Sequence, residues 1–184
     1  MIASFKLKNG HKISVDPLNR STNARELSNF INNLIDEKVY ITRDKKISYD
    51  EQKEEIELSN DKIKAGNIDY LLAWDDGNIV GQVIAQRLSF RLRANLFVRL
   101  YVAKKYRRLG LGEKMMLLLI KRLMNKKNTR NFYVEVAKKN KGAIALYKKL
   151  GFKKTAELPN WMIYENKYLD AIGMILDVKH YVKQ

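Results

Sequence analysis

Residues 94–113 combine arginines and glycines in a spacing that could bind a phosphate group. The stretch reads ANLFVRLYVAKKYRRLGLGE, and its dense run of β-forming residues predicts a buried strand over 94–104. Apolar residues recur at helical spacing from Leu111 onward. The turn between strand and helix contains Arg107, Arg108, Gly110 and Gly112. The first N–H groups of a helix lack internal partners and lie at the positive end of its dipole, so the turn suits an anion. A simple helix start flanked by two solvated arginines would show the same pattern.

A second stretch, residues 130–152, reads RNFYVEVAKKNKGAIALYKKLGF. It predicts a strand over 132–137 and a helix over 140–150, with Asn140 as its N-terminal cap and Gly151 at its end. Four residues share one face of this helix: Ala143, Leu146, Tyr147 and Leu150.

The two stretches together resemble the GNAT superfamily of acetyltransferases. The first fits the superfamily signature R/Q-x-x-G-x-G/A through Arg107, Gly110 and Gly112. The second fits the signature N-x-x-A-x-x-L-Y-x-x-x-G-F through Asn140, Ala143, Leu146, Tyr147, Gly151 and Phe152. The similarity covers roughly residues 68–180, with both motifs in the order and spacing of the superfamily.

The resemblance implies acetyl-coenzyme A as the acetyl donor. In the superfamily, the strands that correspond to 94–104 and 132–137 diverge, and the pantetheine arm of the donor enters between them. The backbone of Leu100, Tyr101 and Val102 would pair with the arm's amides, much as an added strand would. The diphosphate would lie on the turn formed by Arg107, Arg108, Leu109, Gly110, Leu111, Gly112 and Glu113. In these relatives Asn140 and Tyr147 also contact the donor.

Direct acetyl transfer to an amine requires a neutral amine, yet an alkylammonium has a pKa of about 10.4, so a general base is needed. Glu135 resembles the strand glutamate that serves as base in peptide-amine acetyltransferases of the superfamily. Strand 94–104 contains Arg99 but no carboxylate that could serve instead. Glu135 could also simply pair with a lysine such as Lys138. Glu165 and Asp170 are further candidates, although solvated loop positions explain both of them.

Tyr147 occupies the motif position of the tyrosine that protonates the leaving sulfur in many relatives. A thiol has a pKa of about 8.5, so the departing thiolate needs only modest help from an acid. A packed tyrosine with a satisfied hydroxyl is the alternative. Trp161, Tyr164 and Tyr168 could form a wall of the acceptor site, although aromatic residues near the start of a strand more often belong to the core.

Composition excludes several classes of chemistry. The 184 residues contain no cysteine, which removes disulfides, cysteine-ligated zinc and acyl-cysteine intermediates. With two histidines, a histidine metal cluster is not expected, and we predict no metal. No apolar run approaches about 18 residues and no signal-peptide core is present, so we expect a cytoplasmic protein without a membrane partner.

The positive charge is concentrated around the two motifs. Residues 104–154 contain 17 Lys or Arg and only two acids, and they carry nearly all of the net charge of +16. Such a field would attract the phosphates of coenzyme A, and it leaves nucleic acid as a secondary partner.

The remaining pattern predicts a single domain with a mixed, mostly antiparallel sheet. Hairpins are expected around Asn9-Gly10 and Asp76-Gly77-Asn78, with strands at 68–75 and 79–92 around the second. A first helix should start near Ser21 or Thr22, and a second should start at Ser48 and end near Lys64. Strand 94–104, helix 111–127 and strand 132–137 form a right-handed crossover, which makes the two strands a central parallel pair flanked by helices on both faces. Strands at about 151–157 and 170–180 should follow, joined by a loop containing Trp161 and Tyr164.

These observations predict an N-acetyltransferase that acts by direct attack of a primary amine, with a protein N-terminus or a lysine favoured. Few acids are available to bind a polyamine, which favours a peptide acceptor. Two alternatives stay open: a small-molecule acetyltransferase acting on a polyamine or amino sugar, and a non-catalytic protein that binds acyl-coenzyme A or nucleic acid. Either a monomer or a homodimer is compatible with the sequence.

Overall fold

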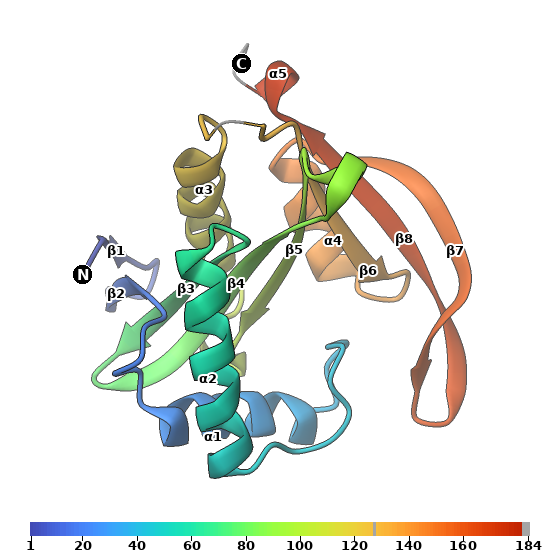
Figure 1. The fold of residues 1–184 in the computed structure, drawn as a ribbon. Helices are drawn as coiled ribbons and strands as arrows, with labels where there is room; N and C mark the ends of the chain where they lie inside the picture. The colour runs from blue at the N-terminus through green and yellow to red at the C-terminus, as the bar shows by residue number, and fades with distance from the viewer. Residues whose placement is uncertain (127, 182–184) are drawn as a thin grey trace. The chain divides into compact units, whose positions relative to one another are not determined.

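The computed structural model describes residues 1–126 and 128–181. The chain divides into two compact units. The first unit comprises Met1–Gln86 and Arg99–Leu119, and the second comprises Arg87–Val98 and Ile120–Gln184. Figure 1 shows the order of the helices and strands along the chain. That the chain is one domain stays a prediction.

The first unit contains an antiparallel arrangement of strands. The strands are β1 (Ala3–Lys6), β2 (Lys12–Pro17), β3 (Ile68–Asp75) and β4 (Asn78–Arg87), followed by the second half of β5 (Asn95–Val102). The hairpin predicted at Asn9-Gly10 is confirmed, because β1 and β2 pair with Phe5 opposite Ile13. The hairpin predicted at Asp76-Gly77-Asn78 is also confirmed, although Asn78 already belongs to β4 and pairs with Asp75. The turn is therefore Asp76-Gly77, and both residues have the positive φ that a tight two-residue turn requires.

Two helices, α1 (Ala24–Asp36) and α2 (Tyr49–Lys64), cover one face of the strands in the first unit. The predicted capping box of α2 is present, with the Ser48 hydroxyl accepting from the Glu51 N–H and the Glu51 carboxylate accepting from the Ser48 N–H. Helix α1 starts slightly later than predicted, because Asn23 is its cap. Leu27 and Leu34 of α1 are fully buried with Tyr70 and Leu72 of β3, each leucine contributing about 1.5–3 kcal/mol.

Helix α3 (Leu111–Leu123) packs on the opposite face of the strands. A Cβ at Gly81 of β4 would lie 2.9 Å from the Met115 sulfur and 3.5 Å from the Ala73 Cβ. Ala73 alternates along β3 with Leu72, which packs with α1 and α2. The two helical layers therefore bury opposite sides of one sheet.

The second unit contains the first half of β5, then β6 (Asn131–Ala137), α4 (Lys141–Lys149), β7 (Lys153–Tyr164), β8 (Lys167–Asp177) and α5 (Val178–Tyr181). Strands β5 and β6 pair in parallel, as predicted, while β6 pairs with β8 and β8 with β7 in antiparallel fashion. The strand order is β1-β2-β3-β4-β5-β6-β8-β7. The predicted fold class, a mixed and mostly antiparallel sheet with one parallel pair and helices on both faces, is confirmed.

Three elements end earlier than predicted. Strand 79–92 ends at Arg87 and is followed by the short turn η1 (Phe90–Leu92), because Phe90 and Leu92 are exposed and find no core to face. Strand 94–104 ends at Val102, where the turn η2 (Lys104–Tyr106) begins. Helix 111–127 ends at Leu123, because Asn125 and Lys126, which follow Met124, are polar and exposed and offer no apolar face to pack. Residue 127 itself lies outside the described residues.

The predicted loop containing Trp161 and Tyr164 is instead part of a long hairpin. Strand β7 continues through both residues, and the turn lies at Glu165 and Asn166, which both have positive φ. The strand continues past Pro159-Asn160 because an irregularity between Leu158 and Met162 absorbs the extra residues. Beyond β8 the chain forms α5 rather than continuing as a strand to residue 180.

Candidate active site

The turn before α3 has the geometry expected of an anion site. Arg108 and Gly110 both have positive φ, at 61° and 91°, so the backbone reverses sharply just before the helix. The Lys114 N–H donates to the Gly110 carbonyl as the first bond of α3, which leaves the N–H groups of residues 111–113 at the helix start. A Cβ at Gly110 would meet nothing within 4 Å, so the space beside this turn is open. These features fit a phosphate group of acetyl-coenzyme A.

Arg107 is held by the protein rather than directed to solvent. Its Nη2 lies 2.6 Å from the Glu37 carboxylate after α1, and its Nε donates to the Val102 carbonyl at 2.8 Å. Arg107 thus ties the turn to the end of β5 and to α1, while the exposed Arg108 remains as the neighbouring cation. Leu109 is anchored as well, because its carbonyl accepts from the Lys8 N–H at 3.4 Å.

The parallel pairing of β5 with β6 is short. Within the described residues it runs from Asn95 opposite Asn131 to Phe97 opposite Tyr133, although β5 continues to Val102 and β6 to Ala137. Leu100, Tyr101 and Val102 are half-buried in the part of β5 beyond this ladder. Their pairing with pantetheine stays a prediction.

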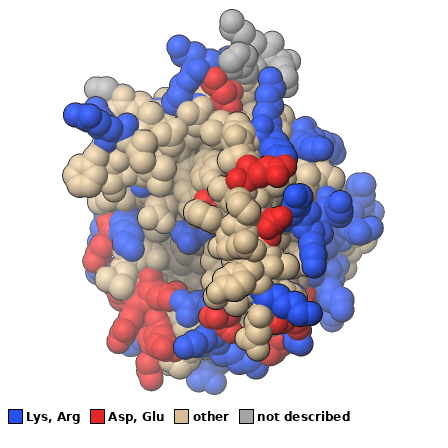
Figure 2. Space-filling view, turned by 90° about the vertical axis from the view of Figure 1, so that its right-hand side faces the viewer, with Lys and Arg blue, Asp and Glu red and all other residues tan. Residues whose placement is uncertain are grey.

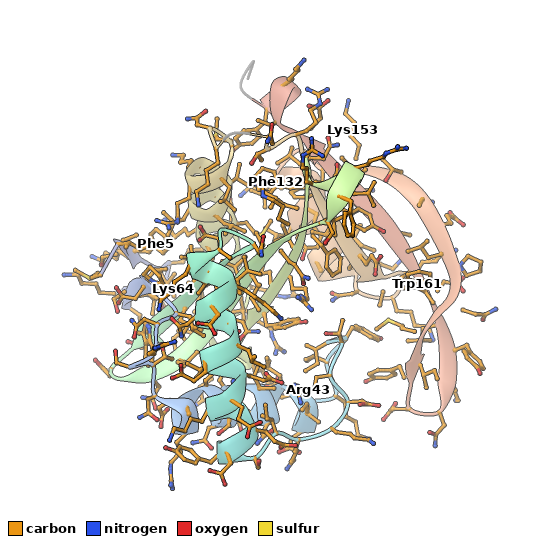
Figure 3. The ribbon with its side chains drawn as sticks, in the orientation of Figure 1. Phe5, Arg43, Lys64, Phe132, Lys153 and Trp161 are labelled. Atoms are coloured by element: carbon orange, nitrogen blue, oxygen red, sulfur yellow. The ribbon has the colours of Figure 1, made fainter. Side chains whose placement is uncertain are left out.

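Glu135 lies on β6, where residues alternate between a buried and a half-buried face. It shares the half-buried face with Tyr133, whose hydroxyl donates to Glu135 Oε1 at 2.9 Å. The indole Nε1 of Trp161 on β7 donates to Glu135 Oε2 at 2.8 Å. Figure 3 shows Trp161 on the β7–β8 hairpin. Both carboxylate oxygens are therefore held in place.

The environment of Tyr133 keeps it a hydrogen-bond donor. Burial, followed by its hydrogen bond to Glu135 and the carboxylate charge, raises the pKa of Tyr133 to about 12. Its ring lies against Gly173 of β8, where a Cβ would come within 3.0 Å of the Tyr133 Cε2 and hydroxyl. A glycine at 173 is thus what allows Tyr133 to reach Glu135.

Asn140 and Tyr147 are positioned by α4. The Asn140 side chain accepts from the Ala143 N–H at 3.1 Å, which confirms the predicted cap. Tyr147 is 6% exposed, and its ring packs against Phe152 with a centroid separation of 5.4 Å. The acid role of Tyr147 and the donor contact of Asn140 stay predictions.

The other sequence candidates have structural partners. Lys138 forms ion pairs with Glu157 and Asp170, at 3.8 and 3.7 Å, and the partners found for Glu135 are Tyr133 and Trp161 instead. Asp170 also accepts from the Asn160 N–H at the irregularity in β7, and Glu165 lies in the hairpin turn. Tyr168 is exposed on β8, and Tyr164 is half-buried.

Basic side chains are abundant on the surface. Figure 2 shows Lys and Arg crowding one side of the face in view, with Asp and Glu in smaller groups. In the parts of the chain that the structure describes, no cluster of three or more His, Asp or Glu is placed to hold a metal ion. No helix among residues 1–126 and 128–181 is long and apolar enough to cross a bilayer.

The fold and the glycine turn define a class of acetyl-transferring proteins, and comparison with known proteins agrees. The sequence pattern of the acetyltransferase (GNAT) family matches residues 35–152, and the chain belongs to this family. It is therefore an acetyl-coenzyme A-dependent N-acetyltransferase, as the sequence predicted.

Individual relatives of known or assigned activity resemble this chain in sequence or in fold. The chain is 31% identical over 112 residues to an N-alpha-acetyltransferase of Sulfurisphaera tokodaii, covering 55% of this chain and 67% of the relative. Its fold resembles that of a ribosomal-protein-S5-alanine acetyltransferase from Vibrio fischeri, with a TM-score of 0.83, 14% identity, and coverage of 97% and 98%. It also resembles a spermidine N-acetyltransferase chimera that includes the Vibrio cholerae enzyme, with a TM-score of 0.78, 20% identity, and coverage of 94% and 99%. The fold alone does not distinguish protein acceptors from small amines.

Sequence reasoning missed the partners of Glu135. Tyr133 could have been found, because it lies two residues earlier on the same strand and so faces the same side. Trp161 could not, because an irregular strand brings it to Glu135 from 26 residues away.

Proposed function

We propose that this enzyme acetylates a peptide or protein amine by direct attack, with an N-terminal amine as the favoured acceptor. The observation that carries the proposal is the Glu135 carboxylate, which is half-buried and held by Tyr133 and Trp161. A fixed carboxylate on the strand before Asn140 is suited to remove a proton from an incoming amine. The 31% identity to an N-alpha-acetyltransferase supports the choice of acceptor.

The turn before α3 and the end of β5 would bind the donor. The N–H groups at the start of α3 and the exposed Arg108 would bind its phosphates, while Arg107 holds the turn in place through Glu37. The backbone of Leu100–Val102 would bind the pantetheine arm. When bound, acetyl-coenzyme A supplies the thioester whose carbonyl carbon the amine attacks.

The proton transfers are assigned to two side chains of the second unit. Glu135 accepts the proton that the amine loses as the new C–N bond forms. Tyr147 donates its hydroxyl proton to the sulfur as the C–S bond breaks, so that free thiol leaves. Each proton has a donor and an acceptor, and no metal is needed in these steps.

Thiol release tests the proposal. Purified enzyme with acetyl-coenzyme A is given an N-terminal peptide, a lysine peptide with a blocked N-terminus, spermidine, an amino sugar, or no acceptor. We expect the N-terminal peptide to give the largest increase above hydrolysis. A larger increase with spermidine or the sugar would refute the peptide acceptor, and no increase with any amine would refute turnover.

Tyr147→Phe tests the acid. The ring packs against Phe152 and is retained, so the variant should fold and bind the donor normally. Loss of the general acid should lower kcat by about 10²-fold while the donor Kd stays unchanged. An unchanged kcat would remove the assigned role.

A further inference from the structure

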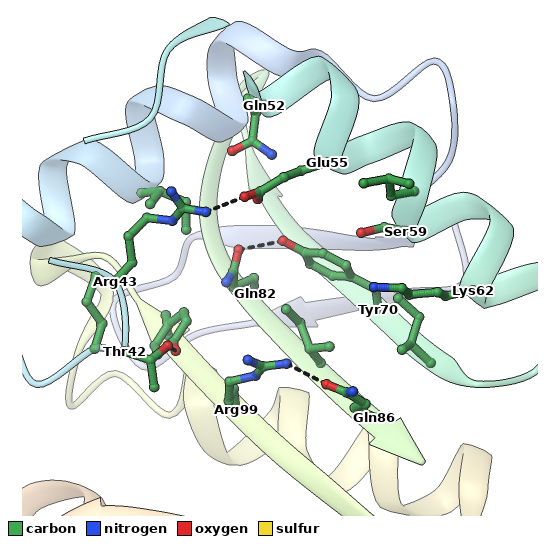
Figure 4. A pocket seen from close by; sticks show the side chains of 16 residues that line it. Thr42, Arg43, Gln52, Glu55, Ser59, Lys62, Tyr70, Gln82, Gln86 and Arg99 are labelled. Carbon is green, nitrogen blue, oxygen red and sulfur yellow. Dashed lines mark hydrogen bonds and ion pairs between the residues drawn. The ribbon is translucent and has the colours of Figure 1, made fainter. Parts of the chain in front are cut away.

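The first unit contains a cavity of about 420 Å³ whose side chains have no role in the proposed donor binding or proton transfer. It is lined by the loop after α1, by α2, and by strands β3, β4 and β5 (Figure 4). Aliphatic side chains such as Ile31 and Ile84 form part of its wall, and polar side chains form the rest. Tyr101 lines it too, and its backbone is one of the groups assigned to the donor.

Two glutamines of the cavity are oriented by their hydrogen bonds. Tyr70 is buried, and burial holds its pKa well above the usual value, so its hydroxyl stays protonated. That hydroxyl donates to Gln82 Oε1 at 2.9 Å. Because the oxygen is the acceptor, the Gln82 NH₂ is left as a donor.

Gln86 is oriented in a similar way. Arg99 has only donors, and its Nη2 lies 3.0 Å from Gln86 Oε1, so the Gln86 side chain also keeps its NH₂ as a donor. Figure 4 shows both hydrogen bonds at the cavity. The polar wall formed by β4 and β5 is therefore rich in donors.

Gln52 on α2 adds an amide to the polar part of the cavity wall. The residue is 3% exposed and lines the cavity. Its amide can both donate and accept, so it is able to hydrogen-bond to a ligand there.

The charges at the cavity favour an anion. Arg43, Lys62 and Arg99 line it, against a single carboxylate, Glu55, which already forms an ion pair with Arg43. A polyamine carries many hydrogen-bond donors and positive charges, so the donors and cations of this wall would repel it. A carboxylate has only acceptors and would complement the wall.

We propose that this cavity binds a carboxylate of the acceptor, which makes the enzyme selective for peptides with an acidic residue near the reacting amine. Arg99 and the Gln82 NH₂ contact the carboxylate, and the aliphatic wall packs against its methylene groups. That the carboxylate belongs to the acceptor rests on the proposed function. That the cavity binds a carboxylate does not.

The test compares peptides that differ at one residue. Glu, Gln or Lys is placed at the second or the third position of one N-terminal peptide, and thiol release is measured with the parent enzyme, Arg99→Gln and the control Lys64→Gln. Lys64 is an exposed cation at the end of α2 and does not line the cavity. Gln86→Glu is a second variant, because its new carboxylate would occupy the Arg99 guanidinium without removing it.

We expect the parent and Lys64→Gln to prefer Glu over Lys by at least about tenfold in kcat/KM at one of the two positions. Arg99→Gln and Gln86→Glu should each lower kcat/KM for the Glu peptide by about tenfold or more and leave the Lys peptide nearly unchanged. Thermal unfolding identifies a variant that has lost its fold. If one of the two variants is unfolded, the kcat/KM values of the other variant test the proposal.

A blocked peptide separates this inference from the proposed function. The N-acetylated Glu peptide has no reacting amine, and its Kd is measured by fluorescence anisotropy. Equal turnover of the Glu, Gln and Lys peptides would overturn the inference while the acetyltransferase function stands. If no peptide is acetylated but the blocked Glu peptide binds in a manner dependent on Arg99, the cavity assignment holds and the peptide acceptor is refuted.

Discussion

Replacing Glu135 by Gln separates the chemistry of this carboxylate from its structural role. Trp161 Nε1 is only a donor, so the Gln oxygen must accept from it. The new NH₂ then faces the Tyr133 hydroxyl, which can rotate and accept a hydrogen bond. Both contacts survive, and the variant loses a charge rather than its position.

The geometry sets the expected magnitudes. Two charge-assisted hydrogen bonds become neutral ones, so the free energy of unfolding should fall by about 1 kcal/mol. Loss of a general base should lower kcat by about 10²- to 10⁴-fold at pH 7. Activity should therefore fall far more than stability.

The dependence on pH follows from the acceptor. An N-terminal amine has a pKa of about 7.7–8.0 and a lysine about 10.4, so an N-terminal amine becomes neutral without help as the pH rises to about 9. The deficit of Glu135→Gln should shrink between pH 7 and 9 with an N-terminal peptide and persist with a lysine peptide. Thiol release at each pH, with urea unfolding in parallel, measures both effects.

Glu157→Gln is the matched control, because Glu157 is an exposed carboxylate of the same unit that pairs with Lys138 and Lys154. It should leave kcat unchanged. If Glu135→Gln kept the parent's kcat, or lost activity no more than Glu157→Gln did, Glu135 would not be the base.

Two further predictions concern stability and the support of the site. Hydrogen bonds from His11 Nδ1, at 2.8 Å, and from the Tyr106 hydroxyl, at 2.7 Å, lower the pKa of Asp75. The ionised Asp75 therefore stabilises the fold above its unfolded pKa of about 3.9. This stabilisation is lost as the pH falls through the lower folded pKa. Asp75→Asn should cost about 1 kcal/mol at pH 6, a difference that vanishes near pH 2 in urea unfolding; a deficit of equal size at both pH values would contradict this account. Gly173→Ala should push Tyr133 away from Glu135, costing about 1–3 kcal/mol and lowering the pKa of Tyr133 from about 12 toward 10. Ultraviolet titration against Tyr133→Phe would detect that change, and an unaltered titration would show that Tyr133 does not depend on Gly173.

Much of the architecture could be predicted because local rules decide it. The Ser48–Glu51 capping box, the Asp76-Gly77 turn and the Asn140 cap each depend on residues within three positions of one another. The parallel pairing of β5 and β6 followed from the handedness of crossovers. The boundaries at Arg87 and Leu123 were missed because a strand or helix stops where packing partners stop, which the alternation of residues does not report.

The sequence alone determined the family, the glycine turn before α3, and the positions of Glu135, Asn140 and Tyr147 within their motifs. Tertiary structure alone decided that Trp161 and Tyr133 hold the Glu135 carboxylate, that Arg107 is bound by Glu37, and that Gln52, Gln82 and Arg99 share one cavity. Motifs are readable because their residues act through the backbone over a few positions. Contacts such as that between Glu37 and Arg107, 70 residues apart, depend on how whole strands and helices pack, and no local pattern encodes them.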